Sequence, residues 1–156
     1  MRRMKRARTV VDDDRITTFG LLHEAHGRLS HAFGRTFANA GISSPIFEVL
    51  LRIGRSKEQL KTSELARQLS VTTGGATRLV DRAVTAGLVE RQACPTDRRV
   101  QYVALTPLGE QTLVRITPLH LRDLEREMVG RLTPDELAAL RSALHKLGRA
   151  ERPPAN

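Results

Sequence analysis

The sequence has few of the residues on which several classes of protein depend. Among its 156 residues are one cysteine, one tyrosine, four phenylalanines and no tryptophan. A single cysteine excludes an intrachain disulfide framework. Aromatic residues make up only 3%. This argues against a protein that binds single-stranded nucleic acid, because such proteins stack bases on aromatic rings.

Long apolar runs are missing too. No stretch approaches the roughly 18 apolar residues that are required to cross a bilayer. The basic residues at the N-terminus are not followed by the apolar run of a signal peptide. We therefore expect a cytoplasmic protein without a membrane partner. Its length fits one domain, or two lobes joined by long helices.

The motifs of common enzyme classes are not found in the sequence. It has neither a glycine loop that would cradle phosphates nor a nucleophile elbow. The acidic run Asp12–Asp14 suits a helix start, where the helix dipole favours negative charge. His23 and His26 share a helical face, but no carboxylate or cysteine completes a set of metal ligands. We expect no enzyme, no metal and no cofactor.

The balance of charge favours an anionic partner. The 26 Lys and Arg residues outnumber the 17 Asp and Glu residues, which gives a net charge of +9. The excess is spread along the chain and is strongest near the N-terminus, where residues 1–13 form either a DNA-binding arm or a solubilising tail. With single strands disfavoured, the charge supports binding to duplex DNA, although only moderately.

Both ends of the chain have the spacing of amphipathic helices. Residues 14–40 carry an apolar stripe at steps of three and four: Phe19, Leu22, His26, Leu29, Phe33 and Phe37. Thr106 and Pro107 predict a helix to about Gly130, kinked or broken at Pro118. A capping box that begins at Thr133 predicts one more helix after it. We interpret 14–40 and 107–150 as a helical dimerisation lobe; the alternative is a monomeric helical core.

The middle of the chain, residues 41–106, has a different organisation. Ser44 and Pro45 predict one helix start, residues 54–61 a loop, and Thr62 the start of a short helix. A turn follows, and then a helix that ends at Gly87. Residues 88–93 and 99–105 are expected to form strands. The predicted fold is mainly α with a small β-hairpin wing, which is the order of a winged helix-turn-helix domain.

The second helix of this domain has the features of a helix that reads the DNA major groove. Its start is small and polar, and its outer face carries hydroxyl and basic groups. We expect DNA contacts from Thr72, Thr73, Gly74, Gly75, Thr77, Arg78 and Arg82. The two glycines cost about 1 kcal/mol each within a helix. Close approach to DNA explains that cost; a simple cap conformation is the alternative.

The tip of the predicted hairpin combines one acid with two bases, Asp97, Arg98 and Arg99. An arginine that is held by a carboxylate suits the narrow minor groove of DNA. A turn with an ordinary surface ion pair is the alternative. Because the tip follows a helix-turn-helix pattern, we interpret it as a DNA-binding wing.

The run from Thr77 to Gly109 resembles the recognition helix and wing of the MarR family of regulators. The matching residues are Thr77, Arg78, Leu79, Val80, Asp81, Arg82, Gly87, Leu88, Val89, Glu90, Arg91, Pro95, Asp97, Arg98, Arg99, Val103, Leu105, Thr106 and Gly109. The family's usual leucine is replaced by Ala83. The resemblance implies a homodimeric repressor that binds a pseudo-palindromic operator and is released by a small molecule bound between the lobes.

Three further hypotheses concern regulation. His26 and His120 each interrupt an apolar stripe, so they either line a site for a small anionic or aromatic effector or form hydrogen bonds within the core. Cys94 lies among predicted wing arginines, which favours a thiolate and gives the alternative of a redox-responsive regulator. The last alternative is a winged helix that contacts only proteins.

Overall fold

The computed structural model describes residues 11–94 and 100–148. Its elements, in chain order, are α2 (Asp14–Asn39), α3 (Ser44–Arg55), β1 (Leu60–Lys61), α4 (Thr62–Gln68), α5 (Thr73–Thr85), β2 (Val89–Ala93), β3 (Gln101–Leu105), α6 (Pro107–Glu127), the 3₁₀ helix η1 (Val129–Arg131) and α7 (Pro134–Gly148). The predicted fold class, mainly α with a small antiparallel sheet, is confirmed. Over the described ranges, no helix is long and apolar enough to span a bilayer.

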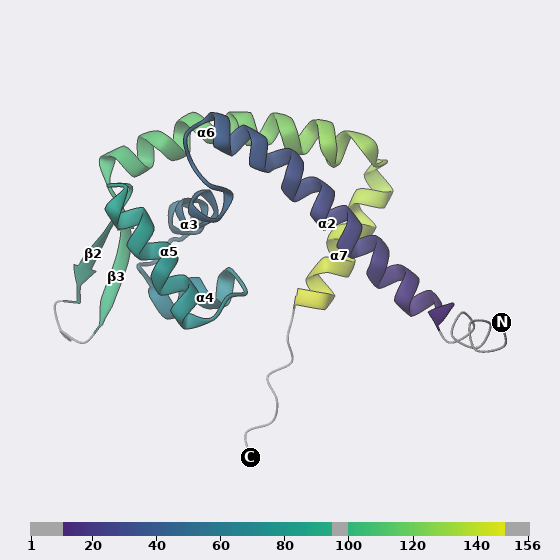
Figure 1. Cartoon of the computed structure of the whole chain (residues 1–156), viewed down its shortest axis with the longest axis horizontal. Coiled ribbons are helices and arrows are strands. Elements are labelled where there is room, and N and C mark those ends of the chain that lie inside the picture. Colours follow the sequence, from purple (N-terminus) through teal and green to yellow (C-terminus); the bar gives the residue numbers. More distant parts are fainter. Residues whose placement is uncertain (1–10, 95–99, 149–156) are drawn as a thin grey trace, which may run out of the picture.

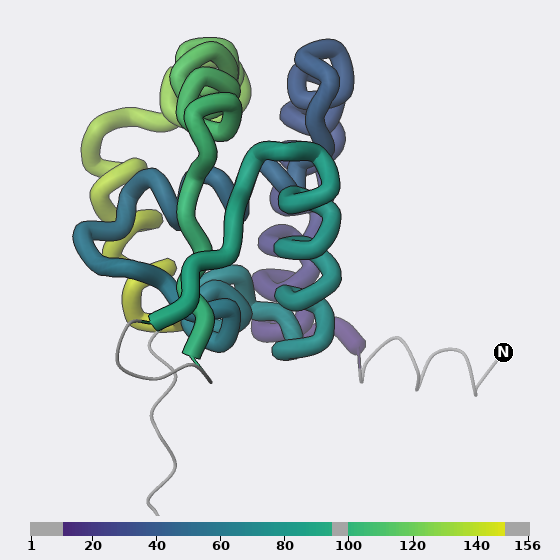
Figure 2. Tube along the Cα trace, turned by 90° about the vertical axis from the view of Figure 1, so that its left-hand side faces the viewer, coloured from purple at the N-terminus to yellow at the C-terminus, as the bar shows by residue number. Residues whose placement is uncertain are grey.

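The long helices form an arch with a compact unit at one end (Figure 1). Helix α6 curves along the top of the picture, and α2 descends from its middle towards α7 on the right. Helices α3, α4 and α5 lie at the left with the β2–β3 hairpin. Seen from the hairpin side, α5 and the strands stand next to each other below α6 (Figure 2).

The core lies around α3, which contacts α2, α4, α5, α6 and β3. Its buried face is formed by Ile46, Phe47, Val49 and Leu50. The ring of Phe47 stacks on that of Phe37 from α2, with centroids 4.6 Å apart. Ile116 of α6 is fully buried in the same cluster. The compact unit and the long helices therefore share one hydrophobic core.

The sheet has three strands rather than the expected two. Strand β3 lies in the middle, and both neighbours run antiparallel to it. The third strand, β1, pairs Leu60 with Val103 and Lys61 with Tyr102. The prediction of a loop over residues 54–61 was therefore wrong at both ends, since α3 also continues to Arg55. Two strand residues are too few to show an alternating pattern.

The predicted helix starts are confirmed where a threonine side chain forms the cap. Thr72 accepts from the backbone N–H of Gly75, Thr106 accepts from that of Gly109, and Thr133 exchanges hydrogen bonds with Glu136. The expected caps at Ser44 and Thr62 were wrong by one residue. Ser43 and Lys61 occupy those positions, and neither forms a side-chain cap bond.

Helix α6 continues through Pro118 and ends at Glu127. Its first turn is joined tightly to the end of α5. The hydroxyl of Thr106 donates to the carbonyl of Gly87 at 2.6 Å, and the backbone N–H of Thr106 donates to the carbonyl of Leu88 at 3.2 Å. A Cβ added at Gly109 would collide with that same Leu88 carbonyl. Only glycine lets α6 approach so closely.

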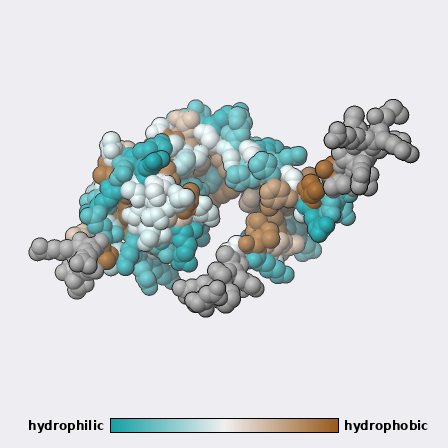
Figure 3. All heavy atoms as spheres, turned by 60° about the horizontal axis from the view of Figure 1, so that its bottom comes forward, coloured by the Kyte–Doolittle hydropathy of each residue, from teal (hydrophilic) through white to brown (hydrophobic). Residues whose placement is uncertain are grey.

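The first half of the predicted apolar stripe on α2 is exposed, namely Phe19, Leu22 and His26. Phe37 is buried, but Phe19 is 69% exposed and Leu22 is 44% exposed. Leu144 and Leu147 of α7 are exposed as well. Apolar surface gathers on the half of the molecule that holds α2 and α7, at the right of the picture (Figure 3). A single chain therefore leaves a large apolar face in water.

Candidate nucleic-acid interface

The helix-turn-helix consists of α4, a short turn and α5. The turn reverses the chain at Ser70, whose φ of 54° lies in the left-handed region. It is fixed by the backbone N–H of Val71, which donates to the carbonyl of Ala66 at 3.0 Å. Helix α5 ends at Thr85 with Ala86 as its C-cap; Gly87 follows with a φ of 70°, and the N–H of Leu88 donates to the carbonyl of Ala83. That arrangement is a Schellman motif, which requires a residue that tolerates positive φ.

The exposed face of α5 carries the residues that were predicted to contact DNA. Ala76, Val80 and Ala83 are buried at helical spacing against the core. The residues away from that face are exposed: Thr73, Gly74, Thr77, Arg78 and Arg82, together with the cap Thr72. Six of the seven predicted contacts on this helix thus lie on its open side, and Gly75 is half-buried.

The two adjacent glycines have different surroundings. A Cβ at Gly75 would lie 3.2 Å from the hydroxyl oxygen of Thr72 and 3.6 Å from the Cβ of Val71. A Cβ at Gly74 would meet nothing within 4 Å. Gly75 is thus explained by packing within the cap. No described residue packs closely enough against Gly74 to require glycine there.

The arginines of α5 differ in their surroundings from the threonine beside them. The hydroxyl of Thr77 donates to the carbonyl of Thr73 at 2.9 Å, which fixes its orientation. Arg78 and Arg82 are exposed, and neither side chain forms a hydrogen bond or ion pair with a described residue. Their donors are therefore available for an acceptor outside the chain, such as a guanine edge or a phosphate.

An ion pair joins α5 to the hairpin. Arg91 of β2 donates to the carboxylate of Asp81 at 2.6 Å. The pair offsets the only negative charge on α5, which would otherwise repel phosphate. Sequence reasoning matched both residues to a family pattern without assigning them this role. The signal was available, since Asp81 lies one turn beyond Thr77 on the same exposed side.

The predicted wing residues Asp97, Arg98 and Arg99 lie outside the described residues. The strands that lead to them are present, with Ala93 paired to Gln101 at the far end of the hairpin. Cys94 is half-buried there, and the hydroxyl of Tyr102 donates to its sulfur at 3.9 Å. The basic arm falls largely outside the described chain as well.

The structure brings His26 and His120 to one cavity of about 410 Å³ between the long helices and the compact unit. It is lined by side chains of α2, α3 and α6 and by the α4–α5 turn: His26, Ser30, Phe33, Phe37, Ser44, Glu48, Arg52, Gln68, Leu69, Ser70 and His120. The His120 ring lies 5.0 Å from that of Phe33 and 5.4 Å from that of Phe47, measured between centroids.

Burial lowers the pKa of His120, and the carboxylates of Glu48 and Asp123 oppose that shift. The nitrogens Nδ1 of His120 and Nε of Arg52 are both buried without a partner among the described residues. Arg52 also forms a 3.3 Å ion pair with Glu48. The cavity thus combines aromatic walls with two nitrogen atoms that have no hydrogen-bond partner among the described residues, an arrangement that suits a small planar anion. In the described ranges, no cluster of three His, Cys, Asp or Glu residues has the geometry to hold a metal.

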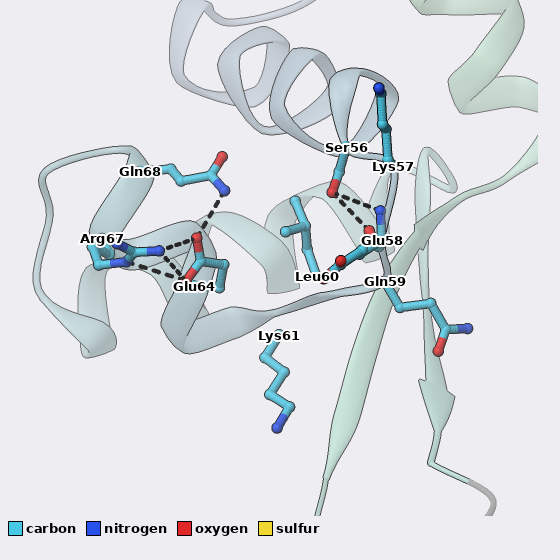
Figure 4. A pocket seen from close by; sticks show the side chains of 9 residues that line it. All are labelled: Ser56, Lys57, Glu58, Gln59, Leu60, Lys61, Glu64, Arg67 and Gln68. Carbon is cyan, nitrogen blue, oxygen red and sulfur yellow. Dashed lines mark hydrogen bonds and ion pairs between the residues drawn. The ribbon is translucent and has the colours of Figure 1, made fainter. Parts of the chain in front are cut away.

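A second hollow, of about 510 Å³, lies between the end of α3, β1 and α4 (Figure 4). Its polar groups largely bind one another. Glu64 accepts from Arg67 at 2.6 Å and from Gln68 at 2.9 Å. The side chains of Lys57 and Lys61 point in opposite directions. Since its charges are paired or diverge, we assign no ligand to this hollow.

Comparison with known proteins identifies the family. The model of the MarR family matches residues 40–100. The multiple antibiotic resistance protein MarR of Escherichia coli (strain K12) is 33% identical over 127 residues, which cover 81% of this chain and 88% of that protein. The chain belongs to the MarR family of transcriptional regulators.

Solved structures of MarR-family regulators have the same fold. A mutant E. coli MarR complexed with operator DNA superposes with a TM-score of 0.77 at 32% identity, covering 86% of this chain and 95% of that one. A MarR-family transcriptional regulator from Streptomyces coelicolor in complex with DNA gives 0.81 at 26% identity, covering 88% and 91%. The winged helix-turn-helix expected from the sequence is confirmed for this MarR-family chain.

The two glycines of α5 provide a test of the interface. Replacement of Gly74 by alanine should leave the free energy of unfolding unchanged or raise it by up to about 1 kcal/mol, since space is open and alanine favours helix. DNA affinity should nevertheless fall, because the methyl group stands between backbone and DNA. Gly75→Ala should instead lower stability by crowding Thr72. Urea unfolding and fluorescence anisotropy measure the two effects, and undiminished affinity of Gly74→Ala would contradict the proposed approach.

Proposed function

We propose that the chain is a sequence-specific repressor that binds duplex DNA as a homodimer, with α5 of each copy in the major groove. The observation that carries the proposal is the open face of α5, where Arg78 and Arg82 have no partner among the described residues and a Cβ at Gly74 would meet open space. From the sequence alone, we assign Arg98 and Arg99, which lie outside the described residues, to the adjacent minor groove.

The homodimer is supported by the apolar face that one chain leaves uncovered. An apolar groove of about 440 Å³ runs between α2, η1 and α7, and its walls include Leu22, Leu29, Met128, Leu140 and Leu144. An exposed apolar area of this kind marks an interface in soluble proteins. We assign it to a second copy and propose residues 14–40 and 107–150 as the dimerisation lobe, with 41–106 as the DNA-binding domain.

Loss of Arg78 should weaken binding and relax sequence preference. With duplex DNA from upstream of the chain's own gene, we expect Arg78→Ala to cost about 1–3 kcal/mol in binding free energy, because a bidentate contact to guanine is removed. Arg35→Ala is the matched control, since Arg35 is exposed on α2 beyond the compact unit. Competition with a duplex of unrelated sequence measures how strongly each variant prefers the upstream DNA. Equal affinities of the two variants would refute the role of α5.

A charge in the apolar stripe should separate the two copies. We expect Phe19→Glu to give monomers by sedimentation velocity, since the carboxylate would be buried without a partner in the dimer. The folded monomer should tolerate it, because Phe19 is 69% exposed. Because the variant no longer dimerises, its affinity for DNA should also be lower than that of the wild type. Arg35→Glu places the same group on the opposite side of α2 and should remain dimeric; a dimeric Phe19→Glu variant would place the interface elsewhere.

We further propose that the cavity of His26 and His120 binds a small aromatic carboxylate whose binding releases the DNA. The donors of Arg52 and His120 fit the carboxylate, and the rings of Phe33 and Phe37 fit the aromatic part. The cavity wall includes Ser70 and Leu69, in the turn that leads into α5. A bound molecule would therefore press directly on the start of the recognition helix.

The pH dependence of ligand binding tests this site. A bound carboxylate favours the charged form of His120, whereas burial keeps the pKa of free His120 below its usual value. Binding should therefore take up a proton, and benzoate should bind more tightly at about pH 6 than at about pH 7.5. We expect His120→Phe to lose this dependence and His145→Phe, on the exposed face of α7, to keep it. Calorimetry in two buffers of different ionisation enthalpy measures the affinity for benzoate and the number of protons taken up on binding. Identical pH profiles for the two variants would show that His120 is not part of the site.

A further inference from the structure

Val71 stands out because it is apolar and exposed at the tip of the recognition helix. Over residues 41–94 and 100–105, it is the only large hydrophobic residue that is exposed, at 40%. Every other large apolar side chain of this unit in the described ranges is buried or partly covered. An exposed valine on a surface that is otherwise built of threonine, glycine and arginine calls for a physical explanation.

The position of Val71 is fixed from both sides. Ser70 before it is held at a φ of 54°, and the N–H of Val71 donates to the carbonyl of Ala66 at 3.0 Å. Thr72 after it forms the N-cap of α5 through its 3.1 Å bond from Gly75. β-Branched residues have few rotamers. The two methyl groups of Val71 are therefore presented in a nearly fixed direction.

The side chain lies at the end of α5 that is proposed to approach the bases. A Cβ at Gly75 would be 3.6 Å from the Cβ of Val71 and 3.8 Å from its Cγ2, so Val71 rests against the first turn of α5. N-terminal residues of a recognition helix contact base edges in the major groove. The only apolar group on those edges is the C5-methyl of thymine.

We infer that Val71 is a specificity-determining residue that contacts the C5-methyl group of a thymine in each half-site. The inference rests on the proposed function, since it requires α5 to enter the major groove. It adds a preference that the polar residues of α5 do not supply: Arg78 selects guanine through hydrogen bonds, whereas Val71 selects thymine by burying a methyl group. Thymine and uracil differ only in that methyl, so they separate this contact from every hydrogen bond.

The test is a cycle of two proteins and two DNA duplexes. Full-length wild type and Val71→Ala are titrated with the footprinted duplex and with the same duplex carrying deoxyuridine at one thymine pair at a time. We expect deoxyuridine at one symmetric pair to weaken wild-type binding by roughly threefold to tenfold. Val71→Ala should bind the thymine duplex as weakly as the wild type binds the deoxyuridine duplex. The variant should have the same affinity for both duplexes.

Controls separate this contact from a structural role. Val114→Ala, the same change at an exposed position of α6, should still distinguish thymine from deoxyuridine. Val71→Thr, which keeps one methyl group, should distinguish them by a smaller factor. If Val71→Ala weakens binding to both duplexes equally and retains the discrimination, or if wild type does not discriminate at any thymine, the inference is wrong. If wild type prefers no duplex at all, the proposed function fails first.

Discussion

The close contact between the first turn of α6 and the end of α5 is the constraint on which this architecture depends. Gly109 lets α6 approach the carbonyl of Leu88, and Thr106 binds the carbonyl of Gly87. Those two carbonyls belong to the turn in which α5 ends. The turn that ends α5 is therefore held directly against the first turn of α6.

The positive charge of the chain is modest and is not concentrated on the winged helix. Its net charge of +9 is spread out, so in the proposed dimer we expect affinity to come from placed contacts made by each of the two copies. In the proposed dimer, α2, α6 and α7 hold the two copies together. The cavity of His26 and His120 lies between those helices and the α4–α5 turn. DNA, partner and effector would then act on one continuous core, which runs from Phe37 through Phe47 to Val80.

Much of this arrangement could be predicted from the sequence, because its signals are local. Threonine caps fixed the starts of α5, α6 and α7, and Gly87 fixed the end of α5 through its need for positive φ. The buried residues of α5, Ala76, Val80 and Ala83, recur at helical spacing that is visible in the sequence. His26 and His120 were paired on pattern alone, and they do share a cavity.

What was missed depends on contacts between distant segments. Strand β1 exists only because Leu60 and Lys61 meet β3 about forty residues later, and no period is visible in two residues. The different surroundings of Gly74 and Gly75 depend on how the turn places Val71 and Thr72. The exposure of Val71 and the pairing of Asp81 with Arg91 are likewise tertiary properties. The sequence lists these residues, but it does not show which residues from distant segments lie next to them in the fold.

The central claim is that two copies of α5 read one DNA duplex symmetrically. Its most direct test is the selection of bound sequences from a random pool of duplexes by the full-length protein, followed by footprinting of the enriched sites. Symmetric binding by two copies of α5 predicts a pseudo-palindrome whose half-site centres lie about 34–36 Å apart, one helical turn on the same face of the DNA. Enrichment of a single asymmetric site, or no enrichment above the starting pool, would contradict it.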